Sequence, residues 1–311
     1  MQAQAVVFQA PKHLELVGMA LRPPGAGELE VDVEFSGIST GTERLLWDGT
    51  MPAFPGMGYP LVPGYESVGR IARVGQNTTL GVGSKIFVPG AQCFEGVRNL
   101  FGGSASRLVV REDRVVAVDE SLGAKAVLLA LAATAQHALT NEAPPDLIIG
   151  HGVMGRLLAR LTLAAGHPSP VIWESNLTRQ DGATGCTVIH PDDDAKRDYR
   201  AIYDVSGDST ILDKAIACQA PGGEVVLAGF YKQPLSFAFA PAFMRETRIR
   251  IAAQWKRDDL ETVTSLALDG RLSLDGLITH TEKHANAASA YKVAFGDADC
   301  LKMILDWKHS A

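Results

Sequence analysis

The chain has few cysteines, no surplus of positive charge and no long apolar run. Its four cysteines, Cys93, Cys186, Cys218 and Cys300, show no Cys-x-x-Cys spacing. This argues against a disulfide framework and a cysteine-based zinc site, and it is typical of a reducing cytoplasm. The net charge of −6 comes without a basic stripe, which argues against a nucleic-acid partner. We find no signal peptide and no run of about 18 apolar residues, so we expect a cytoplasmic protein without a transmembrane segment.

What the chain does have is a glycine-rich turn between a short apolar run and a helical stretch. The turn reads Gly150-His-Gly152-Val-Met-Gly155. Gly150 permits the tight turn, Gly152 lets a backbone approach a pyrophosphate, and Gly155 lets helix and strand pack closely. The start of the helix, at Val153 and Met154, offers free N–H groups to the phosphates. The pattern predicts a dinucleotide-binding turn.

A second apolar run follows this helix and closes on Glu174. A carboxylate at that place accepts hydrogen bonds from the ribose hydroxyls of NAD, so we expect NAD as the cofactor. Open α/β sheets bind ligands at the carboxyl ends of their strands. We therefore expect Asp204, Ser206, Gly229 and Phe230, at two later strand ends, to line the nicotinamide side. A glycine-rich turn in some other α/β domain is the alternative.

Short strands dominate the first part of the chain, and from residue 146 strands alternate with helical stretches. This alternation predicts an α/β fold with a parallel sheet covered by helices on both faces. Helical spacing is found at 121–140, 258–269 and 284–295. The expected strands are Gln4–Phe8, Leu14–Val17, Glu28–Phe35, Gly69–Val74, Lys85–Val88, Ser106–Val110, Leu147–Ile149, Val171–Trp173, Thr187–Ile189, Ala201–Val205, Glu224–Ala228, Arg248–Ala252 and Cys300–Leu305.

Five motifs carry a resemblance to a known family. In the family's order they are GISTGTE (37–43), PGYESVGRIARVG (63–75), FGGSASRLVV (101–110), LLALAATAQHAL (128–139) and GGEVVLAGF (222–230). Over essentially its whole length the chain resembles the medium-chain dehydrogenase/reductase superfamily. The resemblance implies a β-rich GroES-like substrate domain over 1–122, a Rossmann domain with a doubly wound parallel sheet over 123–268, and a C-terminal return over 269–311. It also implies a hydride transfer to a nicotinamide cofactor, with Arg179 over the adenine.

The zinc ligands of that superfamily are missing from the matching positions. The position of the ligating cysteine falls on Ser39 or Thr40, that of the histidine on Tyr65, and that of the third ligand on Ala130. Only Cys93 lies in the region of the structural-zinc lobe. Because hydroxyl and methyl groups are poor zinc ligands, we predict an enzyme without zinc. A rearranged metal site built from His137, Glu43 or Glu66 is the alternative.

Without zinc, the proton of an oxidised alcohol needs another path, and hydroxyl groups at the vacated site are the candidates. We expect the catalytic residues to be Ser39, Thr40, Tyr65 and Glu66. Tyr65 either hydrogen-bonds the substrate oxygen and passes its proton on, or only fills the vacated space. Glu66 has a structural alternative, a pair with a basic residue. His137 is either a relay or a packing residue.

The segment between these motifs forms a loop with one charged residue, Asp48, that is rich in aromatic and methionine side chains, namely Trp47, Met51, Phe54, Met57 and Tyr59. Such side chains bind flat, polarisable ligands, although a loop packed on its own domain or on a partner subunit has the same composition.

The segment 35–69 most resembles the branch of the superfamily that oxidises the 1-hydroxyethyl group of a bacteriochlorophyllide to acetyl in bacteriochlorophyll biosynthesis. That resemblance implies a chlorin or bacteriochlorin substrate. Candidate partners of its propionate are Arg44, Arg98 and Arg107.

Two other functions remain open from the sequence. One is a zinc-free quinone or enoyl reductase using NADPH, against which Glu174 argues because a carboxylate repels a 2′-phosphate. The other is a catalytically inactive nucleotide-binding sensor, since such a protein would also lose zinc ligands. A homodimer is a further expectation by analogy with the superfamily, with Glu224–Ala228 as the candidate edge strand.

Overall fold

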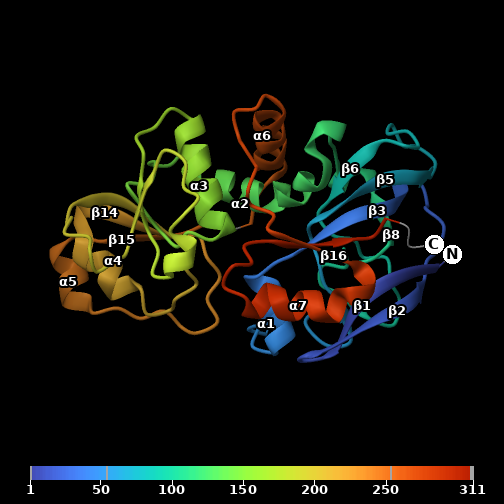
Figure 1. Ribbon diagram of the computed structural model, residues 1–311, viewed down its shortest axis with the longest axis horizontal. Coiled ribbons are helices and arrows are strands. Elements are labelled where there is room, and N and C mark those ends of the chain that lie inside the picture. The colour runs from blue at the N-terminus through green and yellow to red at the C-terminus, as the bar shows by residue number, and fades with distance from the viewer. Residues whose placement is uncertain (1, 54, 253, 309–311) are drawn as a thin grey trace. The chain divides into compact units, whose positions relative to one another are not determined.

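A computed structural model describes residues 2–53, 55–252 and 254–308. The chain forms two compact units, which are drawn in Figure 1. The first unit holds the residues up to Ala130 and those from Leu277 onward, and the second holds Leu131–Gly276. The C-terminal segment therefore returns to the first unit, which we call the substrate unit. We call the second the nucleotide unit.

The substrate unit is built mainly from strands, as the alternating apolar runs of its sequence dictate. Its core contains fully buried Phe8, Ile38, Leu61 and Ile86. Its elements are β1 (Gln2–Ala10), β2 (His13–Ala20), β3 (Glu28–Ile38), α1 (Thr42–Asp48), β4 (Leu61–Val62), β5 (Ser67–Val74), β6 (Lys85–Val88), β7 (Arg98–Asn99), β8 (Arg107–Arg111), η1 (Glu112–Arg114), β9 (Val116–Ala117), η2 (Glu120–Leu128), β16 (His280–Lys283), η4 (His284–Asn286), α7 (Ala287–Gly296) and β17 (Met303–Asp306).

Two sheets make up this unit. The larger has the order β16-β17-β3-β5-β6-β9, with β8 also paired to β3, and the smaller has the order β2-β1-β4-β7. In the larger sheet, β17 pairs antiparallel with the end of β3, so that Met303 lies opposite Ile38. The end of β3 leads directly into the Ser39 turn. The C-terminal return therefore lies beside the segment in which sequence reasoning places the catalytic hydroxyls.

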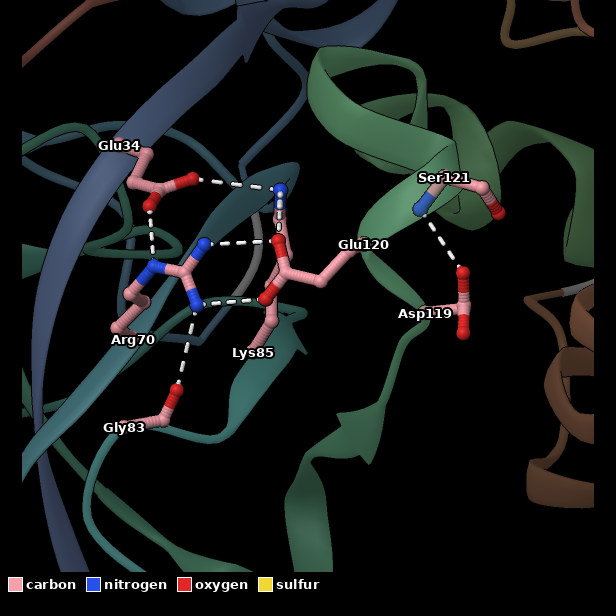
Figure 2. Close-up of polar contacts among 7 residues, drawn as sticks. All are labelled: Glu34, Arg70, Gly83, Lys85, Asp119, Glu120 and Ser121. Atoms are coloured by element: carbon pink, nitrogen blue, oxygen red, sulfur yellow. Dashed lines mark hydrogen bonds and ion pairs between the residues drawn. The ribbon is translucent and has the colours of Figure 1, made fainter.

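A network of ion pairs fastens the start of η2 to the larger sheet (Figure 2). Arg70 on β5 donates from Nε to Glu34 on β3 at 2.7 Å, and from its two terminal nitrogens to Glu120 at 2.6 and 2.7 Å. The ammonium of Lys85, on β6, lies 3.3 Å from Glu34 and 3.7 Å from Glu120. Glu120 raises the pKa of Arg70 through its hydrogen bonds, and Glu34 adds to this. The network holds the beginning of the segment that leads toward the nucleotide unit.

The nucleotide unit contains a six-stranded sheet of order β12-β11-β10-β13-β14-β15 in which every neighbouring pair is parallel. The order reverses direction beside β10, the topological position at which sheets of this kind bind ligands. Its elements are α2 (Leu129–Leu139), which begins at the unit boundary, β10 (Leu147–Ile149), α3 (Val153–Ala164), β11 (Val171–Trp173), η3 (Leu177–Arg179), β12 (Thr187–Ile189), β13 (Tyr199–Asp204), α4 (Leu212–Cys218), β14 (Gln219–Leu227), α5 (Phe239–Met244), β15 (Arg248–Ile251) and α6 (Arg257–Leu268).

One sequence prediction is corrected by this fold. The strand near Glu224–Ala228 is not an edge strand, because β15 pairs with it from Glu224 to Leu227. The expected lack of a transmembrane segment stays a prediction, because Glu120–Leu139 is long and apolar enough, by length and composition, to cross a membrane. That segment is interrupted at Gly123 (φ 51°), and slightly more than half of its most apolar window is buried inside the protein, as in a core helix.

Candidate active site

The glycine turn of the nucleotide unit has the geometry of an anion-binding turn. Gly150 follows β10 with φ of 104°, a conformation that favours glycine. A Cβ on Gly155 would collide with the carbonyl oxygen of Gly150, so helix α3 can pack this closely only with glycine there. A Cβ on Gly152 would meet nothing within 4 Å. Gly152 caps α3 without a side-chain hydrogen bond, which leaves the first N–H groups, at Val153 and Met154, suited to a phosphate.

Glu174, directly after β11, is held beside this turn. One of its carboxylate oxygens accepts the backbone N–H of His151 at 3.0 Å, and the other accepts that of Asn176 at 2.8 Å. Each oxygen keeps a second lone pair, which suits a ribose hydroxyl. The carbonyl oxygen of Arg179 accepts from His151 Nδ1 at 2.6 Å and from Arg156 at 3.1 Å, so these side chains fix the segment after Glu174. Burial lowers the pKa of both His151 and Arg156.

The residues that we expect on the nicotinamide side differ in how deeply they are buried. Asp204 is fully buried, and its carboxylate accepts the backbone N–H of Ser206 at 3.0 Å and the hydroxyl of Tyr231 at 2.5 Å. Burial raises the pKa of Asp204. Asp204 therefore holds the strand ends, and its place beside the nicotinamide stays a prediction. Ser206 and Phe230 are exposed and Gly229 is half-buried at those strand ends.

A cluster of hydroxyl groups lies in the substrate unit where the sequence resemblance expects zinc ligands. The hydroxyl of Tyr65 donates to Ser39 Oγ at 2.5 Å and lies 3.1 Å from Thr42 Oγ1. Ser39 is buried and Tyr65 is half-buried. Thr40, which we predicted as catalytic, is exposed and makes no hydrogen bond with Tyr65 in the described chain. Thr42, on the first turn of α1, supplies the hydroxyl that sequence reasoning missed.

The electrostatic setting of Tyr65 decides what its hydroxyl can do. Burial raises its pKa, and the carboxyls of Glu66 and Glu43 raise it further, against the smaller opposing effect of Ser39 and Thr42. The phenol therefore stays protonated near neutral pH. It can donate a hydrogen bond and relay a proton, but it cannot act as a preformed tyrosinate base.

Beneath the hydroxyl cluster lies a buried carboxyl group, Glu43 of α1. Its Oε2 accepts the backbone N–H of Ser39 at 2.9 Å, and its Oε1 accepts the hydroxyl of Tyr291 from α7. Burial raises the pKa of Glu43 to about 7, and the charge of Glu66 adds to the effect while Ser39, Tyr291 and Lys302 oppose it. Glu43 thus fixes the turn that carries Ser39.

Glu66 forms a fully buried ion pair with Lys302, which precedes β17. The ammonium lies 2.7 Å from Glu66 Oε2 and donates to the Ile38 carbonyl oxygen at 3.2 Å, and both side chains are only 1% exposed. A Cβ on Gly37 would collide with the Glu66 carboxylate, so glycine is required beneath it. This geometry supports the structural alternative for Glu66, whose part in proton handling stays a prediction.

The apolar loop is packed largely on its own unit. Trp47 is 9% exposed and contacts the rings of Phe8 and Tyr291, so it packs in the core, and its contact with a substrate stays a prediction. Met51, Met57 and Tyr59 are half-buried against the same core, which leaves part of each side chain accessible, whereas Phe54 lies outside the described residues.

The residues proposed for an alternative metal site do not come together. His137 Nδ1 lies 2.8 Å from Asp259 Oδ2 in the nucleotide unit, and Ala130 is buried. Glu43 and Glu66 are engaged as described above. In the described part of the chain, no three His, Cys, Asp or Glu side chains gather as a metal-binding group.

A β-rich unit joined to a parallel nucleotide-type sheet is the architecture of the alcohol dehydrogenase class. Residues 25–120 match the alcohol dehydrogenase GroES-like domain. The chain is 54% identical, over 99% of both sequences, to the 2-desacetyl-2-hydroxyethyl bacteriochlorophyllide A dehydrogenase of Rhodobacter capsulatus, and 50% identical, over the full length of both, to that of Cereibacter sphaeroides. An Escherichia coli short chain alcohol dehydrogenase in complex with NADH has the same fold, with a TM-score of 0.85, 20% identity and coverage of 98% and 99%.

The chain therefore belongs to the medium-chain dehydrogenase/reductase superfamily, in the same family as the two bacterial relatives. The family resemblance and the α/β class predicted from the sequence are confirmed.

Proposed function

We propose that this protein oxidises the hydroxyethyl group of a bacteriochlorophyllide-type macrocycle to acetyl, with NAD as the hydride acceptor and without zinc. The names of the two close relatives support the substrate class. The observation that carries the chemistry is the Tyr65–Ser39 hydroxyl pair, which stands where the superfamily resemblance expects zinc ligands. In the reaction, the carbinol carbon loses a hydride and its hydroxyl loses a proton, which yields a ketone, reduced cofactor and one proton.

The nucleotide unit fits a nicotinamide dinucleotide. Gly152 leaves space for a pyrophosphate at the start of α3, and Glu174 has lone pairs for the ribose hydroxyls. When bound, the cofactor supplies the nicotinamide ring that accepts the hydride. Glu174 favours NAD over NADP, because a carboxylate beside a 2′-phosphate is repelled strongly in a partly buried site. Arg179, half-buried at the end of η3, stays our candidate for the adenine side.

The hydroxyl cluster manages the proton. Because Tyr65 stays protonated, it donates a hydrogen bond to the substrate oxygen or to Ser39, and it passes a proton on only as it receives one. Thr42, at 3.1 Å, gives the relay a second hydroxyl. Such positioned proton transfer is worth about 10²–10⁴-fold in rate.

Zinc does not fit the donors that this chain presents. Zinc prefers thiolate, imidazole and carboxylate ligands in tetrahedral geometry. The three matching positions hold two hydroxyl groups and a methyl group, at Ser39, Tyr65 and Ala130. The nearest carboxylate of that motif, Glu66, is neutralised by Lys302. The site therefore handles the proton with hydroxyls.

The three arginines that we consider as partners of the substrate propionate differ in the ion pairs that they already form. Arg107 lies 2.6 Å from Asp32 and 3.4 Å from Glu30, and Arg44 lies 3.7 Å from Asp48. Arg98 is exposed on β7, and no carboxylate of the described chain lies within ion-pair distance of it. We therefore propose Arg98 as the partner of the propionate, with Met51, Met57 and Tyr59 contributing apolar contacts.

The test is a spectroscopic assay on purified protein with metal analysis of the same sample. Adding 2-desacetyl-2-hydroxyethyl bacteriochlorophyllide and NAD should shift the long-wavelength absorbance band of the macrocycle as the conjugated acetyl group forms. Turnover should persist after exhaustive chelation. No shift with either NAD or NADP would refute the activity, and stoichiometric zinc whose removal reversibly abolishes turnover would refute the zinc-free mechanism.

An NADPH-dependent reductase is the second candidate, and one observation favours it. Arg156 lies close enough to Glu174 and Arg179 for both charges to act on its pKa, which Glu174 raises and Arg179 lowers, so cationic groups stand near the carboxylate. Comparing affinities for NADH and NADPH in the wild type and in Glu174→Ala separates the two. We expect the wild type to prefer NADH and the variant to lose that preference. Tighter binding of NADPH by the wild type would overturn the NAD assignment.

We also infer a homodimer that forms through β15, the actual edge strand of the parallel sheet. Its outer residues Ile249 and Ile251 are 39% and 76% exposed, and the edge offers unpaired backbone groups to a second copy. Nearby Phe239 and Phe243 are exposed as well. Sedimentation of Ile251→Lys should show monomers where the wild type shows dimers, and a wild-type monomer would refute the inference.

A further inference from the structure

An aromatic side chain that the proposed chemistry does not use lies against Tyr65. Phe101 packs on Tyr65 edge to face, with ring centroids 5.3 Å apart and ring planes at 85°. Phe101 is nevertheless 37% exposed, whereas Phe8, Phe87 and Phe94 of the same unit are buried. The Phe101 ring therefore contacts Tyr65 and is also partly exposed at the surface of the unit.

The backbone around Phe101 is held rigidly from two sides. Its carbonyl oxygen accepts the N–H of Ala91 at 2.8 Å, and the next N–H, of Gly102, donates to the Val62 carbonyl at 3.0 Å. A Cβ on Gly90 would lie 2.5 Å from the Phe101 carbonyl oxygen and 2.8 Å from its Cβ. A glycine is therefore required at position 90 for the chain to present Phe101 in this place.

The segment that carries Phe101 runs beside the segment that carries Tyr65. Strand β7 pairs in parallel with β4, and the pairing continues past both strands, where Gly103 donates to Gly64 at 2.8 Å and Ser104 to Pro63 at 2.9 Å. The relative position of the two rings is therefore set by backbone hydrogen bonds and not by side-chain packing alone. A ring fixed in this way binds a ligand without losing much conformational entropy.

We propose that Phe101 is the stacking platform for the flat face of the macrocycle, and that it places the ring periphery beside the Tyr65 hydroxyl. This rests on the proposed function. Two aromatic systems gain from offset stacking beyond the area they bury, and an exposed, preorganised ring is the group that a conjugated disc would use. The hydroxyethyl group is a peripheral substituent, so stacking the disc on Phe101 brings that substituent toward the tyrosine in contact with it.

The experiment compares Phe101→Leu, Phe101→Ala and Phe101→Tyr. Equilibrium binding of 2-desacetyl-2-hydroxyethyl bacteriochlorophyllide, without cofactor, is followed by the quenching of its fluorescence, and NADH binding is titrated on the same samples. We expect Phe101→Leu and Phe101→Ala to raise the macrocycle Kd about tenfold, consistent with the loss of one aromatic contact. Phe101→Tyr should stay within about twofold of wild type, and NADH affinity should be unchanged in all three.

Phe239→Leu is the matched control, because it removes an exposed ring from the nucleotide unit and should leave macrocycle binding unchanged. Wild-type Kd values in Phe101→Leu would overturn the inference, as would equal weakening in Phe101→Tyr, which would indicate a packing role. Failure of the proposed function gives a different result, since the wild type itself then does not oxidise the macrocycle in the absorbance assay described above.

Discussion

The pH dependence of stability offers a direct test of the buried carboxyl group beneath the hydroxyl cluster. Burial raises the folded-state pKa of Glu43 to about 7, from an ordinary value of 4.5. Between these two pH values the folded protein keeps a proton that the unfolded chain has released. Stability contributed by this group therefore falls as pH rises from about 4.5 to about 7, and the loss is complete above that range.

The size of the effect follows from the shift. About 2.5 pKa units, the difference between 7 and 4.5, correspond to about 3 kcal/mol at 1.36 kcal/mol per unit. Glu43→Gln replaces the protonated form by a neutral isostere that still accepts the Ser39 N–H. The unfolding free energy of the variant minus that of the wild type should therefore increase by about 3 kcal/mol between pH 4.5 and pH 8.

The assay is urea unfolding of both proteins across this pH series. Glu112→Gln is a control of opposite sign, because the backbone N–H groups of Leu80 and Thr79 lower the pKa of the Glu112 carboxyl. With the series extended to lower pH, its difference from wild type should fall as pH rises toward about 4.5 and stay nearly constant above that. If the difference in unfolding free energy between Glu43→Gln and the wild type stays constant with pH, the raised pKa is refuted, and with it the conclusion that burial keeps Glu43 protonated.

Three further predictions concern the site. Lys302→Met should destabilise the protein by about 3–5 kcal/mol in urea unfolding, because it leaves the Glu66 carboxylate buried and unpaired. Adding Glu66→Gln to that variant should restore most of the lost stability, and no restoration would contradict the pairing. Tyr65→Phe should lower kcat about 10²-fold with NAD binding unchanged, whereas full turnover would reduce the ring to a space-filling role. Gly152→Ala should weaken NADH binding roughly tenfold in a fluorescence titration while Tm stays constant, and a fall in Tm would show that the glycine serves folding instead.

The sequence predicted the nucleotide unit more accurately than the catalytic residues. Strands such as Leu147–Ile149 and Val171–Trp173 were predicted with their observed bounds, because each is a short apolar run closed by glycine, proline or a charged residue. The dinucleotide turn was equally accessible, since its glycines act on neighbouring backbone within a few residues. The collision that forbids a side chain at Gly155 involves only Gly150. A single sequence therefore predicts features that depend on neighbouring residues most accurately.

Most of the site residues missed by sequence reasoning depend on distant parts of the chain, Thr42 being the local exception. Tyr291 and Lys302 reach Glu43 and Glu66 across most of the sequence, because α7 and β17 return to the substrate unit. No spacing rule connects a lysine near the C-terminus to a glutamate near the start of β5. The burial of Trp47 was not predictable for a related reason, since the composition of an apolar loop does not tell which of its faces is buried.

These distant residues also bear on the proposed zinc-free chemistry. A zinc site places two positive charges against its ligands, and their removal would leave any remaining carboxyl groups buried and repelling one another. Here Lys302 neutralises Glu66, and Glu43 keeps its proton up to a pH of about 7. The groups that act most strongly on the pKa of Tyr65 include no cation that would draw its hydroxyl into the ionised state. Under the proposed function, a proton leaving the substrate therefore moves along hydroxyl groups in step with the departing hydride, because these groups do not stabilise an alkoxide formed beforehand.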